Sequence, residues 1–129
     1  MRTIKFRGKD RKSGEWFFGN LYDADNRGRT HICSLERGSL DVDPSTVGQF
    51  AGLFDKNGKE IYEGDIVQSK LKRARKYDER LVVCFGKLEW KVKNANGSTT
   101  SLSLIAEYHT IEVIGNIHDN PELLKGGAE

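Results

Sequence analysis

The chain has 129 residues, of which 36% are hydrophobic and 31% charged, and its formal net charge is +2. A chain of this length fits one domain with a single core, and no apolar run approaches the ~20 residues that span a bilayer. Cys33 and Cys84 lie far apart and form no Cys-x-x-Cys pair. We therefore expect two reduced, structural thiols in a cytosolic protein.

The positive charge is concentrated in two segments. Residues 1–12 hold six basic residues and one acidic residue, a net charge of +5. Residues 70–80 hold six basic and two acidic residues, a net charge of +4, so the remainder carries −7. This asymmetry is more informative about partners than the small total.

Alternation at the N-terminus predicts a β-hairpin over residues 3–22. Ile4 and Phe6 occupy one face of its first strand, which we expect to enter a core. Lys5 and Arg7 occupy the opposite face, which we expect to point outward. The aromatic second strand follows a turn.

The next segments alternate between loop and strand. A polar loop is expected over 23–29, a short strand over 30–35 and another loop over 36–44. Asp43 and Pro44 have the chemistry of a helix N-cap and first helical position. We expect one helical turn there and then extended chain.

Two tight turns are predicted in the stretch DKNGKEIYEGDIV. Asn57-Gly58 predicts a type I′ hairpin turn, which needs positive φ at both residues. A strand over 59–62 follows, and Gly64 then allows a second turn in which Asp65 accepts backbone N–H groups. We interpret Asn57, Gly58, Gly64 and Asp65 as structural turn residues.

The C-terminal half continues the β pattern. A hairpin is expected around Gly86, a turn at Asn96-Gly97 and an alternating strand over 110–117, whereas 101–108 fits a strand or a short helix. Asn120 and Pro121 predict a short helical turn. The tail 126–129 should fray.

Many short strands separated by turn signals predict a mainly β fold with minor α. We expect a small antiparallel, SH3-like, partly open barrel with an N-terminal hairpin and a short C-terminal helical turn. A single domain should cover residues 1–125, with 70–80 inserted as a basic loop or hairpin arm.

The sequence carries no motif of a known catalytic site. The three histidines, His31, His109 and His118, have unrelated spacings, so no metal site is predicted. Carboxylates such as Glu60 and Glu63 flank tight turns, where we expect them to cap turns and face solvent. We therefore predict a protein that is not an enzyme and needs no cofactor.

The basic segments leave three interpretations open. They form a solvated loop or guarded sheet edge, a surface for nucleic acid, or a surface for an acidic protein partner. Small barrels do bind oligonucleotides on an exposed strand face. The residues that would carry such binding are Lys5, Arg7, Lys70, Lys72, Arg73, Arg75, Lys76 and Tyr77.

Most aromatic residues are expected in the core, because a lightly apolar chain needs them to fill it. Trp16, Phe17 and Phe18 are consecutive and cannot all face one side of a strand. At least one must point outward, which favours a homo-oligomer interface. The aromatic residues for which a core position is favoured over a ligand-binding one are Trp16, Phe17, Phe18, Phe50, Phe54, Phe85 and Trp90.

Several of these stretches together resemble the YopX family of small phage and prophage proteins. The resemblance runs from Ile4 to about Leu124, through IKFRGKD, GEWFFGNLY, VDPSTVGQFAGLFDKNGKEIYEGDIV, VVCFG and IEVIGNIHDNPELL. Residues 70–80 follow no family pattern, so a role for them would be specific to this chain.

The resemblance implies a mainly β, barrel-like protein that acts in the bacterial cytoplasm, and it brings no catalytic residue or cofactor. Our leading hypothesis is a non-catalytic phage or prophage accessory protein that works by binding, as a homo-oligomer. The alternatives are a nucleic-acid-binding module that uses segments 1–12 and 70–80, and an enzyme of unknown type.

Overall fold

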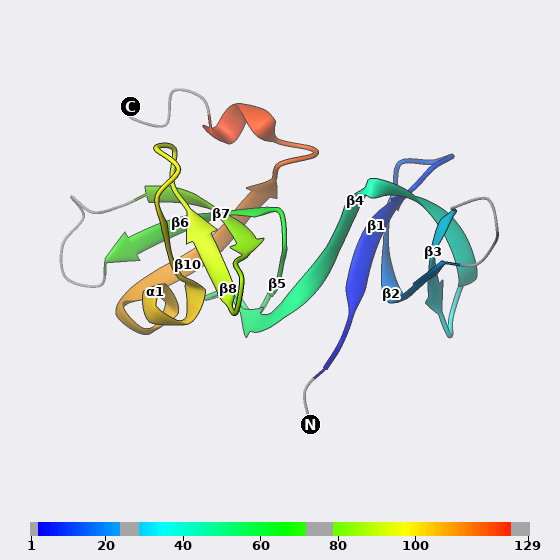
Figure 1. Cartoon of the computed structure of the whole chain (residues 1–129), viewed down its shortest axis with the longest axis horizontal. Helices are drawn as coiled ribbons and strands as arrows, with labels where there is room; N and C mark the ends of the chain where they lie inside the picture. The colour runs from blue at the N-terminus through cyan, green and yellow to red at the C-terminus, as the bar shows by residue number, and fades with distance from the viewer. Residues whose placement is uncertain (1–2, 24–28, 72–78, 125–129) are drawn as a thin grey trace. The chain divides into compact units, whose positions relative to one another are not determined.

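The computed structural model of the chain describes residues 3–23, 29–71 and 79–124 (Figure 1). The chain divides into two compact units, Met1–Gly52 (the N-terminal unit) and Leu53–Glu129 (the C-terminal unit). That one domain covers residues 1–125 stays a prediction. In the part of the chain that is described, no helix has the length and apolar character needed to cross a membrane.

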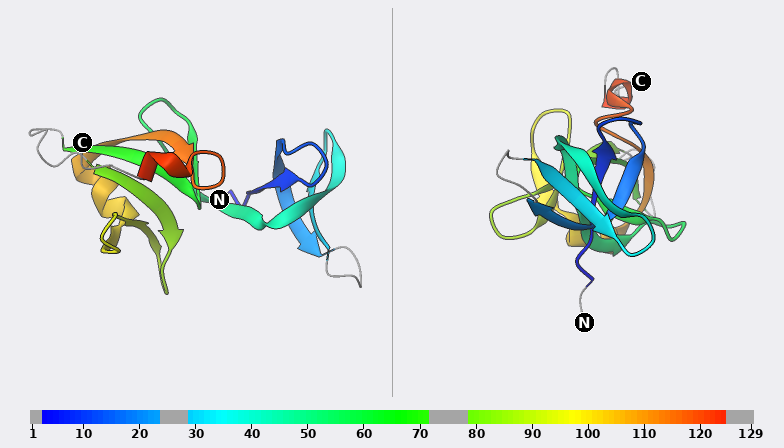
Figure 2. Two further views of the ribbon diagram at one scale, coloured as in Figure 1. Left: turned by 90° about the horizontal axis from the view of Figure 1, so that it is seen from above. Right: turned by 90° about the vertical axis from the view of Figure 1, so that its right-hand side faces the viewer.

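The N-terminal unit is built from antiparallel strands that pair in a ring. Strand β1 pairs with β2, β2 with β3 and β3 with β4, and β4 also pairs with β1, which closes the ring. Figures 1 and 2 show these strands curving around a shared interior. Their bounds are β1 Phe6–Asp10, β2 Trp16–Asp23, β3 Thr30–Ser34 and β4 Gly38–Phe54, the last continuing into the C-terminal unit.

The interior of this ring is small and holds Phe17, Ile32 and Val42, all buried. Two glycines let the backbones of β1 and β2 approach it closely. A Cβ atom on Gly8 would lie 3.1 Å from the Val42 Cβ, and one on Gly19 would lie 2.2 Å from the Cys33 carbonyl oxygen. The second distance is far inside van der Waals contact, so a side chain at Gly19 is incompatible with this strand pairing.

The expectation of a loop over 36–44 followed by a helical turn is wrong, because β4 runs without a break from Gly38. The cap chemistry of Asp43 is used in a bulge instead. Its carboxylate accepts the Ser45 backbone N–H at 3.0 Å, and its carbonyl accepts the Thr46 hydroxyl at 2.6 Å. The β1–β4 register shifts at this point, so Pro44 lies where the missing N–H costs no ladder bond.

The C-terminal unit contains a five-stranded antiparallel sheet in the order β10-β6-β7-β8-β9. Strand β5 is hydrogen-bonded to β4 across the turn that joins them. The bounds are β5 Glu60–Tyr62, β6 Asp65–Leu71, β7 Glu79–Phe85, β8 Trp90–Lys93, β9 Thr99–Ser101, α1 Leu102–Tyr108, β10 His109–Asn116 and the 3-10 helix η2 Pro121–Leu124.

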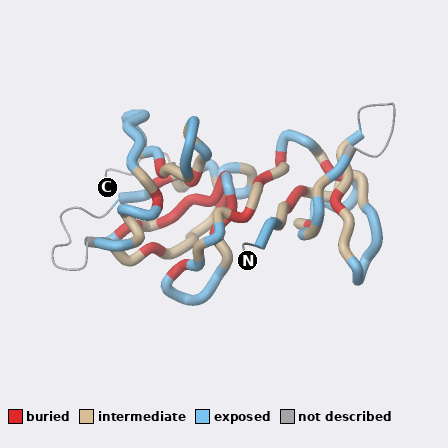
Figure 3. Tube along the Cα trace, turned by 60° about the horizontal axis from the view of Figure 1, so that its bottom comes forward, coloured by how far each residue is buried: buried red, intermediate tan, exposed pale blue. Residues whose placement is uncertain are grey.

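The undecided segment 101–108 is a short helix. The Ser101 hydroxyl accepts the Leu104 N–H and starts the helix, and the His109 N–H donates to the Ile105 carbonyl at its end. Leu102 is fully buried and holds the helix to the unit. Figure 3 shows the buried stretches of the chain; in this unit the buried apolar residues are Ile61, Tyr62, Ile66, Val67, Leu81, Val83, Val92, Leu102 and Ile111.

The turn at Asn57-Gly58 is of a different type from the predicted one. Gly58 has a φ of +81°, but no described non-glycine residue has positive φ, so the type I′ assignment is wrong. The Gly58 N–H donates to the Asp55 carbonyl, and the Asp55 carboxylate accepts the N–H groups of Asn57 and Lys59 at 2.8 and 2.9 Å. The hydrogen bonds of the Asp55 carboxylate therefore stabilise a turn that needs positive φ at Gly58 alone.

The second turn of this stretch centres on Gly64, whose φ is +89°. Its N–H donates to the Val83 carbonyl, and its carbonyl accepts the Ile117 N–H. Asp65 is buried and accepts the Tyr62 N–H at 2.7 Å. The turn thus ties β5, β7 and the chain after β10 together.

The mainly β fold class is confirmed, as are the N-terminal hairpin β1–β2 and the short C-terminal helical turn η2. The strands form two antiparallel sheets, of which the first closes on itself in the N-terminal unit. Likeness to SH3 barrels stays a prediction.

Substitution Gly58→Ala should lower the free energy of unfolding by about 1–2 kcal/mol, because an L side chain disfavours the left-handed region. The position is otherwise open, with no heavy atom within 4 Å of the added Cβ. Gly58→Asn should lose clearly less, since asparagine tolerates this conformation. Urea unfolding of the three proteins tests this, and equal stability of the alanine variant and the original chain would contradict it.

Candidate functional site

The outer face of the β1–β2 hairpin combines cations with aromatic rings. The register sets Arg7 opposite Phe18 and Lys9 opposite Trp16. The Arg7 guanidinium lies 4.5 Å and the Lys9 ammonium 5.5 Å from the Trp16 ring centroid, and the Lys5 ammonium lies 5.9 Å from that of Phe18. These are cation–π distances. We call Lys5, Arg7, Lys9, Trp16 and Phe18 the basic–aromatic face.

The prediction that Arg7 points to solvent is wrong, because its exposed fraction is 6%. The alternation itself is correct, since Phe6 packs against the interior cluster and Arg7 lies on the opposite face. On that face the Trp16 ring lies against the Arg7 guanidinium and shields it from solvent. The prediction that Ile4 enters the core is wrong, because Ile4 precedes the first residue of β1 and is 56% exposed.

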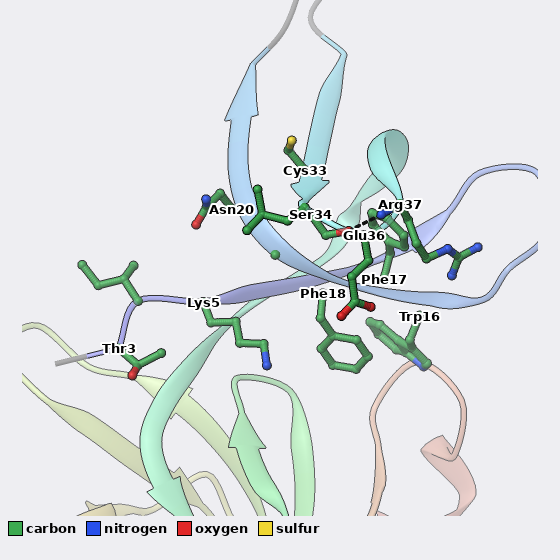
Figure 4. A pocket seen from close by; sticks show the side chains of 13 residues that line it. Thr3, Lys5, Trp16, Phe17, Phe18, Asn20, Cys33, Ser34, Glu36 and Arg37 are labelled. Atoms are coloured by element: carbon green, nitrogen blue, oxygen red, sulfur yellow. Dashed lines mark hydrogen bonds between the residues drawn. The ribbon is translucent and has the colours of Figure 1, made fainter.

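A pocket of about 490 Å³ opens beside this face, within the N-terminal unit (Figure 4). Its volume falls in the ~300–1,000 Å³ range of small-molecule sites. Its walls come from the approach to β1, from the start of β2, and from the end of β3 with the following turn. The lining residues are Thr3, Ile4, Lys5, Trp16, Phe17, Phe18, Gly19, Asn20, Cys33, Ser34, Leu35, Glu36 and Arg37.

The strand register explains why the pocket lies here. Residues Asn20–Asp23 of β2 pair with β3, but Trp16–Gly19 pair with β1 alone among the described strands. Strand β3 ends at Ser34, and the turn that follows leads away into β4. The start of β2 is therefore left with one open edge, and the pocket occupies that space.

Two cations and one carboxylate line the pocket, together with exposed aromatic surface. The Arg37 guanidinium lies 4.9 Å from the Phe17 ring centroid, and the Ser34 hydroxyl accepts the Arg37 N–H at 3.0 Å, which fixes the turn. Phe18 is 41% exposed. In the view of Figure 4, Lys5 lies to the left of the Phe18 ring, Trp16 to its right and the Glu36 carboxylate above it.

A second pocket of the N-terminal unit, about 570 Å³, is lined by charged side chains. Two of these charges are paired with each other, since the Arg11 Nε donates to the Asp41 carboxylate at 3.1 Å. Hydrogen bonds from the Ser13 hydroxyl and the Lys12 N–H lower the pKa of Asp10. The lining residues are Asp10, Arg11, Lys12, Arg29, Leu40 and Asp41.

The buried carboxylate Asp55 serves the turn that it starts. Burial raises its pKa, but backbone N–H groups of Val113, Lys59 and Asn57 outweigh this, and the pKa is lowered overall. The Val113 bond, at 2.9 Å, joins the turn to β10. A carboxylate held ionised by three backbone donors is suited to structure rather than to proton transfer.

The histidines and cysteines lie in separate surroundings. His31 stacks on Tyr22 with centroids 5.7 Å apart, and the His109 Nδ1 lies 2.8 Å from the Ser69 hydroxyl. Cys33 and Cys84 are half-buried and form no disulfide. Within the described ranges, no three His, Cys, Asp or Glu side chains gather closely enough to hold a metal ion.

The structure places few of the predicted binding residues together. Lys5 lines the pocket and Arg7 lies buried on the basic–aromatic face. Lys70 is exposed in β6, in the C-terminal unit. That the two basic segments adjoin stays a prediction. The other predicted residues, Lys72, Arg73, Arg75, Lys76 and Tyr77, lie outside the described residues.

The expectation of aromatic core residues is wrong for several positions. Phe17 and Phe50 are buried, but Phe18, Phe54 and Phe85 are 41%, 59% and 53% exposed. Two of the three consecutive aromatic residues, Trp16 and Phe18, lie on the outer face, in agreement with the prediction that at least one points outward. Pairing the basic and aromatic strands by their period of two could have revealed the contacts of Trp16 and Phe18, whereas nothing in the sequence brings Arg37 and Glu36 to them.

Fold and pocket together define a small, mainly β protein with a basic and aromatic surface on its N-terminal strands. A family model described as YopX protein matches residues 5–125, so the chain belongs to the YopX family. No curated protein matches it.

Two solved structures have the same fold. The crystal structure of protein yopX from Bacillus subtilis has a TM-score of 0.64 and 22% identity, with 98% of each chain covered. The crystal structure of protein EF1440 from Enterococcus faecalis has a TM-score of 0.59 and 21% identity, with 97% of this chain and 100% of that chain covered. The likeness therefore extends over nearly the whole of each chain.

Substitution Asp55→Asn should lower the free energy of unfolding at pH 7 by about 1–3 kcal/mol. An equivalent turn shows which hydrogen bonds an asparagine can keep. There the Asn94 amide oxygen accepts the backbone N–H groups of Asn96 and Ser98. The variant should therefore keep the two local bonds and lose the bond from Val113.

The pH dependence of stability gives a second readout for Asp55→Asn. The pKa of Asp55 is lower in the folded protein than in the unfolded chain, where it is near 3.8. Asp55 therefore contributes its full share of the folding stability above pH 3.8 and loses that share as the pH falls through the folded pKa. Urea unfolding at several pH values should show a smaller acid loss for the variant. Parallel pH profiles at equal stability would contradict this role.

Proposed function

We propose that the protein works by binding a negatively charged partner, without catalysis, through the pocket and the basic–aromatic face of its N-terminal unit. The observation that carries the proposal is the gathering of four cation–aromatic pairs around one pocket. Lys5 and Arg37 border that pocket and supply its positive charge. Against these two cations the lining holds one carboxylate, Glu36, so its net charge is positive, and such a surface favours association with a partner of the opposite sign.

The alternative that the protein is an enzyme has less support, because the buried and hydrogen-bonded carboxylates have structural roles. Asp10, Asp55 and Asp65 each accept hydrogen bonds that hold a turn, which accounts for their positions. The partner class is either an acidic protein surface or a nucleic acid. As a YopX-family chain, it would act as a phage or prophage accessory protein in the cytoplasm of a bacterial host.

The double variant Lys5→Gln/Arg37→Gln should lose the partner that the original chain captures from lysogenic cells. Its matched control is Lys87→Gln/Lys93→Gln, which removes the same charge from exposed positions of the C-terminal unit. The control should keep the partner. Parallel captures with and without nuclease separate a nucleic acid from a protein.

Equal capture by the two double variants would contradict the proposed surface. Loss of the partner from both would instead indicate that net charge matters and that the pocket does not. Circular dichroism of each variant confirms that the fold is intact before the comparison is made.

We also propose that the chain self-associates. Large apolar side chains remain exposed at hairpin tips, with Leu35 and Leu88 almost fully accessible, and such surface favours an interface. Light scattering at tens of micromolar should give a mass above that of one chain, and Leu88→Glu should lower it. A monomer throughout would contradict self-association.

A further inference from the structure

We infer that the pocket binds one base of a single-stranded nucleic acid, with Phe18 as the surface on which the base stacks. The inference rests on the proposed function and names its partner. Phe18 is 41% exposed and lines the pocket. Stacking of bases on exposed aromatic rings beside cations is the usual physics of single-strand binding.

The volume of the pocket suits such a ligand. About 490 Å³ of space holds one nucleoside together with ordered water. The pocket is also reached from the open edge of β2, because Trp16–Gly19 pair with β1 alone among the described strands. A strand of nucleic acid can therefore pass along this edge and place one base inside.

The cations lie at the border of the pocket, where the phosphates of that strand would pass. The Lys5 ammonium is held 5.9 Å from the Phe18 ring centroid, and the Arg37 guanidinium 4.9 Å from that of Phe17. Both side chains thus flank the aromatic surface. Phosphate contacts would give affinity that falls steeply with salt.

The carboxylate of Glu36 favours a base over a phosphate inside the pocket. A negative charge among the lining residues repels a phosphate but accepts hydrogen bonds from a base amino group, as carboxylates do with cytosine. Asn20, which also lines the pocket, can donate and accept. The site should therefore prefer adenine or cytosine to thymine, which has no amino group.

Duplex nucleic acid fits this site poorly. Its bases are stacked on one another, so a base must leave the stack before it can reach Phe18. The phosphates alone could still contact Lys5 and Arg37, which predicts weak and strongly salt-dependent duplex binding.

Fluorescence anisotropy with labelled oligodeoxyadenylate, about 16 nucleotides long to fill one site, tests the inference on the full chain. Phe18→Ala should weaken binding by about 5- to 150-fold. Phe54→Ala, which removes a phenyl ring exposed in the C-terminal unit, should leave it unchanged. An oligonucleotide of the same length with abasic sites should bind the original chain and Phe18→Ala equally weakly.

The outcomes separate this inference from the proposed function. The base site is overturned if Phe18→Ala binds oligodeoxyadenylate as tightly as the original chain does. It is also overturned if the original chain binds the abasic oligonucleotide as tightly as oligodeoxyadenylate. If the oligonucleotide does not bind but polyglutamate does, with loss in Lys5→Gln/Arg37→Gln, the inference fails and the proposed function stands. If neither probe binds, both fail. Phe18→Leu, which keeps apolar bulk without an aromatic face, guards against a folding defect and should weaken binding as alanine does.

Discussion

The close approach of strands at Gly8 and Gly19 is the constraint on which the N-terminal unit depends. These glycines lie where a Cβ atom would meet Val42 and the Cys33 carbonyl, so β1 and β2 can close a ring with β3 and β4 around very few side chains. Phe17, Ile32 and Val42 form the buried centre of that interior, and Phe6, Leu21, Leu40 and Val47 pack against them. A core this small gives the unit little apolar stabilisation to spare, and backbone pairing around the ring must supply the rest.

The same constraint determines what the outer face looks like. Because the interior accepts Phe17 alone from the three consecutive aromatic residues, Trp16 and Phe18 lie on the other side of β2, opposite the basic residues of β1. Cation–aromatic pairs follow directly from this register. Where β3 ends, the same strand is left with an open edge, and the pocket forms there. Ring closure and candidate site are thus two consequences of one strand arrangement.

The sequence predicts those features that short-range chemistry decides. Alternating residues and turn glycines indicate the strands, and Asn120-Pro121 indicates the final helical turn, as found. Asp43-Pro44 has the local chemistry of a helix start, yet long-range pairing of β4 with β1 turns it into a bulge. Arg7 has a strand position that local alternation gives correctly, but its burial depends on the ring of Trp16 across the hairpin. Arg37 and Glu36 reach the pocket through the closure of the ring, which no local pattern encodes.

The central claim is that the N-terminal unit binds single-stranded nucleic acid by stacking one base on the Phe18 ring. Photocrosslinking tests it most directly: an oligonucleotide carrying a photoreactive base is irradiated with the protein, and the attached residues are identified by mass spectrometry. Our account predicts attachment at Phe18 and its neighbours in the pocket, Trp16 and Glu36 among them, with loss of attachment when unlabelled single strand competes. Attachment confined to the C-terminal unit, or none at concentrations that give binding, would contradict it.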